Sequence, residues 1–278
     1  MPGTSPLSRL AVAALGALAA RVALRAITAA PQAEALARKN FRGNPVTLAG
    51  GPALAVGATV AAVAGARDAR TGAAFAVAGL GAGFVGGYDD VAGARSDQHG
   101  AKGFRGHLAA LREGRVTTGL VKIAGIGAAA LAASALLPRR RTARAVDVLL
   151  DAGLIAGSAN LVNLLDLRPG RALKAGLLAG VPLAVTGGDA APAGLVGATA
   201  ALLPDDLDEQ IMLGDAGANA LGALLGTAVA ARAGRVTRLG LLAGIVALTA
   251  ASERVSFTKV IERTPVLREL DAFGRRGS

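Results

Sequence analysis

Long apolar stretches alternate with short charged stretches along most of this chain. A helix that crosses a bilayer needs about 20 mostly apolar residues, and nine stretches reach or approach that length. They are residues 7–30, 47–66, 72–88, 117–137, 145–165, 172–186, 190–203, 211–231 and 237–251. The pattern predicts an all-α fold, a polytopic transmembrane helix bundle of about nine spans that occupies residues 1–251.

Three segments differ from the regular pattern of long apolar stretches. Residues 7–30 do not resemble a cleaved signal peptide, because they contain Arg21 and Arg25 and further apolar stretches follow. The sixth and seventh stretches are the shortest, and they predict either one re-entrant pair or two tilted helices. Residues 252–278 are too charged to span, and we expect them to form an interfacial amphipathic helix. Its apolar positions are Val255, Val260, Ile261, Val266, Leu267 and Leu270.

The distribution of charge predicts the orientation. With nine spans, 20 of the 30 Lys and Arg residues fall on the face that carries the C-terminal tail. This bias places that face in the cytoplasm and the protein in the plasma membrane, although Arg139, Arg140, Arg141 and Arg144 lie on the other face. Most acidic residues also fall at helix ends on the basic face. That arrangement is typical of an enzyme that meets a soluble substrate at the cytoplasmic surface, or of a scaffold with a charged face.

A transporter is expected to place ionisable groups near the bilayer midplane instead. The only acids deep in a predicted span are Asp147 and Asp151, toward its outer end. The net charge is +11, and the basic residues lie between apolar stretches. Anionic lipid headgroups and phosphate-bearing substrates are therefore better partners than nucleic acid. The absence of Cys excludes disulfides and thiolate chemistry. Abundant Ala and Gly allow close packing of helices within the chain, and also between two copies of the chain in a homodimer.

Two acidic motifs have the chemistry of a phosphate or metal site. Asp89 and Asp90 end the third stretch, where adjacent carboxylates are costly unless a cation neutralises them. Asp215 lies between Gly214 and Gly217 at the start of the eighth, where glycines permit close approach of a ligand and helix N–H groups attract phosphate. Oxygen ligands suit Mg²⁺. The alternatives are a solvated loop for Asp89 and Asp90 and a helix N-cap for Asp215.

Polar residues also mark the end of the fifth stretch. Asn160, Asn163 and Asp166 are spaced by three and should share one helix face, where they either bind a polar ligand or pair with neighbouring helices. Cations follow at Arg168 and Arg171, and ordinary membrane anchoring also explains these. Two further segments, around Thr47 and around Lys102, Arg105 and His107, identify no function by themselves.

Taken in order, these segments resemble the polyprenyl-phosphate N-acetylhexosamine-1-phosphate transferase superfamily, of which phospho-N-acetylmuramoyl-pentapeptide transferase is one branch. Its Thr-Pro-Thr-x-Gly-Gly-like motif resembles residues 45–51, and its Asp-Asp pair resembles Asp89 and Asp90. Its Asn-x-x-Asn-x-x-Asp motif resembles residues 160–166, and Met-Gly-Asp-x-Gly-Ser resembles residues 212–218. The resemblance extends from about residue 40 to residue 273.

The resemblance implies a reaction in which a sugar-1-phosphate moves from a UDP-sugar to a polyprenyl phosphate and UMP is released, as in cell-envelope glycan synthesis. It implies Mg²⁺ as cofactor, with Asp215 as a ligand and Asp89 and Asp90 assisting the metal or deprotonating the lipid phosphate. Asn160, Asn163 and Asp166 would line the nucleotide–metal region with Thr47 near the substrate. The cations Lys102, Arg105, Arg168 and Arg171 would offset phosphate charge.

The sequence also departs from the family. Pro169 stands where the family often has a second Asp, and residues 264–270 lack the His-rich motif expected before the last span. A catalytically inactive homologue that acts as a membrane scaffold or binds lipid phosphate is therefore the alternative. CDP-alcohol phosphotransferases fit poorly, because the acids they need after residues 90–95 are missing.

Overall fold

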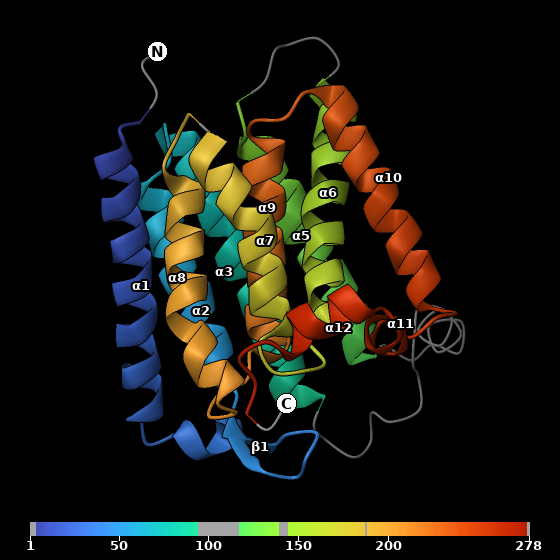
Figure 1. Cartoon of the computed structure of the whole chain (residues 1–278). Helices are drawn as coiled ribbons and strands as arrows, with labels where there is room; N and C mark the ends of the chain where they lie inside the picture. Colours follow the sequence, from blue (N-terminus) through green and yellow to red (C-terminus); the bar gives the residue numbers. More distant parts are fainter. Residues whose placement is uncertain (1–3, 94–116, 139–143, 187, 277–278) are drawn as a thin grey trace.

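The computed structural model describes residues 4–93, 117–138, 144–186 and 188–276. All nine predicted stretches form helices, which run alternately up and down in one bundle (Figure 1). They are α1 (Pro6–Thr28), α2 (Gly50–Ala64), α3 (Ala69–Ala92), α5 (Thr118–Leu136), α6 (Arg144–Leu165), α7 (Arg171–Thr186), α8 (Ala191–Leu207), α9 (Gly214–Ala230) and α10 (Arg235–Ser252). The prediction of an all-α bundle is confirmed.

Five of these helices are long and apolar enough to cross a membrane, namely α1, α3, α5, α6 and α10. This indicates a membrane-embedded protein. The helices α2, α7, α8 and α9 have 15 to 17 residues, so the count of nine spans stays a prediction. Residues 172–186 and 190–203 lie in two separate helices, α7 and α8, which pack against each other.

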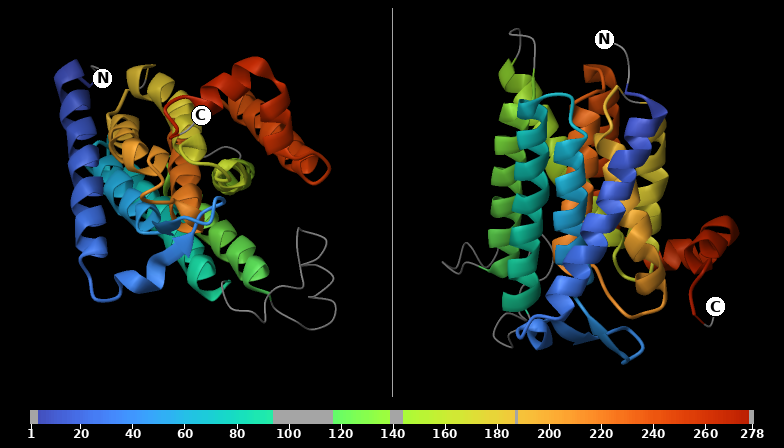
Figure 2. Two further views of the ribbon diagram at one scale, coloured as in Figure 1. Left: turned by 60° about the horizontal axis from the view of Figure 1, so that its bottom comes forward. Right: turned by 90° about the vertical axis from the view of Figure 1, so that its left-hand side faces the viewer.

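A small β-hairpin that the apolar pattern did not predict closes one end of the bundle. The 3₁₀ helix η1 (Ala33–Leu36) leads into β1 (Ala37–Lys39), which pairs antiparallel with β2 (Pro45–Thr47). We call this the hairpin end (Figures 1 and 2). The hairpin also anchors the start of α9, because the backbone N–H of Met212 donates to the carbonyl oxygen of Thr47 at 2.8 Å.

Helix α9 forms the centre of the bundle. Fourteen of its 17 residues are buried, and it packs mainly between α3 and α6. Glycines bring the backbones together, since a Cβ at Gly86 of α3 would collide with the Asp215 carbonyl and one at Gly222 with the Ser158 carbonyl. Close packing of small residues is the main source of helix association in lipid.

Replacing Gly86 by Ala should therefore push α3 away from α9 at the hairpin end. We expect a loss of about 1–3 kcal/mol in unfolding free energy, as for other overpacked sites. Thermal unfolding of the detergent-solubilised protein measures the effect. Gly127→Ala is the matched control, because a Cβ at Gly127 meets nothing within 4 Å. Equal stability of the two variants would contradict the packing argument.

The C-terminal tail differs from the single amphipathic helix that the sequence predicted. It contains two short helices, α11 (Phe257–Arg263) and α12 (Pro265–Ala272). The break is at Thr264, whose backbone is extended with φ −102° and ψ 108°. Proline disfavours helical backbone in the residue before it and lacks the N–H that would continue the helix, so Pro265 begins a new helix instead.

Ion pairs join the helices at the far end of the bundle, opposite the hairpin. Arg238 of α10 contacts Asp151 at 2.5 Å and Asp147 at 3.1 Å on α6, and Arg235 contacts Asp147 at 2.9 Å. Asp151 is 1% exposed. Helix α10 packs mainly on α6 and leans away from the other helices toward the hairpin end (Figure 1). This cluster therefore fixes the upper half of α10.

Candidate functional site

Two of the sequence motifs meet at the hairpin end. Asp89 and Asp90 lie in the last turns of α3, and Asp215 lies in the first turn of α9. They come together because Gly86, one turn earlier on α3, lets that helix touch the Asp215 backbone. We call Asp89, Asp90 and Asp215 the acid cluster.

Asp90 caps helix α9 from a different helix. Its two carboxylate oxygens accept hydrogen bonds from the backbone N–H groups of Asp215 and Ala216, each at 2.9 Å. Gly214 makes room for this contact, because a Cβ at that position would lie 2.9 Å from an Asp90 oxygen. Its φ of +56° is also a backbone conformation that favours glycine. The sequence left two roles open for this helix start, N–H groups that attract phosphate or Asp215 as the N-cap, and in the structure the N-cap residue is Leu213. The N–H groups of Asp215 and Ala216 bind Asp90.

Lys122 neutralises the other two carboxylates. Its Nζ atom on α5 lies 2.7 Å from an oxygen of Asp215 and 3.3 Å from an oxygen of Asp89. All three side chains keep some contact with solvent, with exposed fractions of 15–25%. Asp89 and Asp215 therefore converge on a single cation position, which the Lys122 ammonium group holds. None of the sequence motifs includes Lys122.

A cavity of about 500 Å³ opens beside this ion pair, and we call it the lateral cavity. Asp89, Lys122 and Asn163 line its polar part, while Ile123, Ile126 and other residues of α5 and α6 line its apolar part. Thr249, Ser252 and Glu253 at the end of α10 form the outer wall. The cavity thus joins a charged site at the hairpin end to apolar helix surfaces.

Three asparagines face the lateral cavity. Asn160 donates to the Thr249 hydroxyl at 3.3 Å, and Asn163 lies one turn further along α6. Asn219 is 1% exposed, and its side-chain N–H donates to the Asp215 carbonyl at 2.7 Å. Its side-chain oxygen has no hydrogen-bond partner among the described residues. A buried acceptor without a partner is costly, so Asn219 offers an acceptor for a ligand.

A second cavity of about 210 Å³, the basal cavity, lies at the hairpin end between the hairpin and the turn after α6. Asp166 lines it, so the predicted stripe divides: Asn160 and Asn163 face the lateral cavity and Asp166 faces the basal one. The Arg168 guanidinium lies over the Phe41 ring at 4.6 Å. Lys39 adds a second cation to this lining. An aromatic ring with cations suits a planar, phosphate-bearing ligand.

Burial raises the pKa of Asp166 well above its ordinary value, and the charges of Asp206, Asp215 and Asp90 raise it further. In the part of the chain that the structure describes, no group of three or more His, Cys, Asp or Glu side chains is arranged to hold a metal ion. Within the acid cluster, the carboxylates of Asp89 and Asp215 could contact a metal ion, because Asp90 is engaged by backbone N–H groups.

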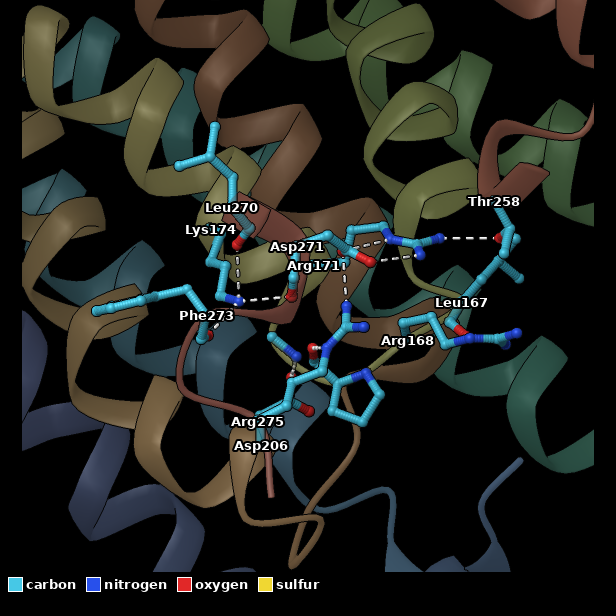
Figure 3. A network of polar contacts seen from close by, with 12 residues as sticks. Leu167, Arg168, Arg171, Lys174, Asp206, Thr258, Leu270, Asp271, Phe273 and Arg275 are labelled. Atoms are coloured by element: carbon cyan, nitrogen blue, oxygen red, sulfur yellow. Dashed lines mark hydrogen bonds and ion pairs between the residues drawn. The ribbon is translucent and has the colours of Figure 1, made fainter. Parts of the chain in front are cut away.

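The remaining predicted residues lie elsewhere. The Thr47 hydroxyl accepts a hydrogen bond from the Ala49 N–H at 3.2 Å, near the start of α2. Arg171 is buried against the tail, where it pairs with Asp271 at 2.8 Å (Figure 3). Lys102, Arg105 and the two histidines fall outside the described residues. No model of a known protein family matches this chain, and no curated protein was found to be similar to it.

Proposed function

We propose that this protein is a plasma-membrane phosphoglycosyltransferase that moves a sugar-1-phosphate from a UDP-sugar to a polyprenyl phosphate at the cytoplasmic face. The observation that supports it is the convergence of Asp89, Asp215 and Lys122 at the charged end of the lateral cavity. A lipid phosphate needs cations for its headgroup and an apolar surface for its chain. The lateral cavity offers both, with Lys122 at one end and Ile123 and Ile126 further along.

The basal cavity is the proposed site of the nucleotide. Phe41, whose ring Arg168 already covers, would line the site of the uracil ring. Arg168 and Lys39 would neutralise the phosphates of the nucleotide. The two cavities approach each other along α6, because Asn163 lines one and Asp166 the other. A UDP-sugar and a lipid phosphate could therefore reach the same region from two sides.

The acid cluster fits Mg²⁺, because Asp89 and Asp215 already share one cation position. Magnesium is usually bound by one or two carboxylates together with substrate phosphates and water, so two protein ligands suffice. The ion would neutralise charge on the diphosphate. Lys122 would then be released to pair with a phosphate oxygen, while Asp90 keeps α9 in position.

The proposed phosphoryl transfer needs no added acid or base. An ionised oxygen of the lipid phosphate attacks the β-phosphorus of the UDP-sugar, and the bond from that phosphorus to the oxygen bridging it to the α-phosphorus breaks. UMP leaves with that oxygen, and the sugar stays on a lipid diphosphate. Such transfer depends on positioning and charge neutralisation more than on a strong base, which agrees with a cluster of carboxylates, a lysine and asparagines.

A second function is supported by the same ion pair. Lys122 neutralises Asp89 and Asp215, so the acid cluster needs no metal ion to be stable. Such a cluster also suits a catalytically inactive scaffold or lipid-phosphate binder. UMP release from a panel of UDP-sugars, with polyprenyl phosphate and Mg²⁺, separates the two. Turnover with at least one sugar supports the transferase. No turnover with any sugar, from protein that unfolds cooperatively, supports the scaffold.

A further inference from the structure

The C-terminal helices meet α7 along an apolar groove of about 150 Å³, which we call the tail groove. Leu165, Ala175 and Leu178 form one wall, and Ile261, Leu267 and Leu270 form the other. The groove is separate from both cavities of the proposed active site.

Buried polar contacts hold the tail against the bundle (Figure 3). Asp271 accepts two hydrogen bonds from Arg171, both at 2.8 Å, and one from Arg275 at 2.6 Å. Lys174 donates to the carbonyl oxygens of Asp271 and Phe273. Burial alone would raise the pKa of Asp271, but the two guanidinium groups outweigh it and hold the pKa below its ordinary value. The tail groove is therefore a fixed feature of the fold.

The geometry of the tail matches the boundary of a membrane. Helices α11 and α12 lie across the direction of the bundle and project beyond it (Figures 1 and 2). The wall of the groove on α7 includes Leu178, which is 69% exposed. On α12, Leu270 is 52% exposed and Phe273, just after it, is 79% exposed. These apolar side chains, two of them in the groove lining, are left exposed by the described part of the protein.

The charges of the tail indicate which molecule covers this face. Arg254, Lys259, Arg263 and Arg268 are exposed. None of the four forms an ion pair within the described part of the chain. On α12, helical spacing places Arg268 away from the stripe formed by Leu267 and Leu270. A face with apolar residues on one side and free cations on the other suits lipid acyl chains and anionic headgroups together.

We infer that the tail groove binds an acyl chain of an anionic phospholipid, with α11 and α12 lying in the headgroup layer. The inference requires only that the bundle is embedded in a bilayer, and it does not depend on the proposed transferase. Ile261, Leu267 and Leu270 contact the chain, and the four cations of the tail select the headgroup.

The chain contains no Trp, so a single introduced Trp reports on this site alone. Leu267→Trp places the probe in the groove, and Arg268→Trp is the matched control on the next residue. Phe273→Trp is a second probe, just after α12 and outside the groove lining, that exchanges one exposed aromatic ring for another and should not disturb folding. Each variant is placed in nanodiscs of phosphatidylcholine that contain one-fifth brominated lipid, either phosphatidylcholine or phosphatidylglycerol.

We expect blue-shifted emission and bromine quenching for Leu267→Trp and Phe273→Trp, and red-shifted, weakly quenched emission for Arg268→Trp. Brominated phosphatidylglycerol should quench both of these probes at least about twofold more than brominated phosphatidylcholine, since each cation near the surface attracts anionic lipid. Equal quenching by both lipids would overturn the headgroup selection. Blue-shifted emission without quenching would mean that protein, such as a second copy of the chain, covers the groove, and would overturn the inference.

Discussion

Replacing Asp215 by Asn is expected to lower UMP release by about a hundredfold or more, the usual effect of removing one group that stabilises charge in a transition state. Asn keeps the shape of the side chain but removes the charge that Asp215 shares with Asp89. The cation position that Lys122 holds then has one carboxylate instead of two. The measurement is the initial rate of UMP release at saturating Mg²⁺, with the UDP-sugar that the panel identifies.

Asp208→Asn is the matched control for this variant. Asp208 lies at the same end of the bundle, is 42% exposed and pairs only with the exposed Arg276 among the ion pairs described. The same chemical change there should leave the rate unchanged. If Asp215→Asn is as active as the parent protein, Asp215 neither binds the metal nor contacts the substrate.

Replacing Asp151 by Leu is expected to lower the unfolding free energy by about 3 kcal/mol or more, because it leaves the Arg238 charge buried without its closest partner. Asp151 is 1% exposed, and its contact with Arg238 at 2.5 Å joins α6 to α10. Thermal or denaturant unfolding of the detergent-solubilised protein measures the loss. Asp208→Asn, which breaks an exposed ion pair, should cost less than about 1 kcal/mol.

The double variant Asp151→Leu with Arg238→Met tests the cause. Replacing both partners of a buried ion pair by apolar residues is often nearly neutral. Most of the stability should therefore return in the double variant, and the two single effects should not add. Additive losses would mean that Asp151 and Arg238 stabilise the bundle independently.

The helices could be predicted from the sequence because lipid imposes a simple rule. A segment in the bilayer must satisfy its backbone hydrogen bonds internally, so apolar stretches become helices even where they are as short as α2 or α7. The hairpin at residues 37–47 could not be found in this way, because it is short, polar and held by pairing with residue 211. The break before Pro265 had a visible local signal, but the apolar spacing on both sides suggested one helix.

The proximity of the three acids was predictable from the sequence, but their partners were not. The order of Asp89, Asp90 and Asp215 along the chain suggested one site, and the structure brings the three together. The roles of the neighbours depend on tertiary contacts. Lys122 lies 33 residues after Asp89, and only the packing of α3 against α5 brings the two side chains together. Asn219 lies four residues after Asp215, on the same face of α9, a spacing that could have revealed it.

The transfer of a phosphosugar can be tested most directly by following the β-phosphate. A UDP-sugar labelled with ³²P in its β-phosphate is incubated with the purified protein, polyprenyl phosphate and Mg²⁺, and lipid and aqueous fractions are separated. We expect the label to move into the lipid fraction while unlabelled UMP accumulates. Label that remains in the aqueous fraction, either as intact substrate or as UDP, would contradict the proposed transfer.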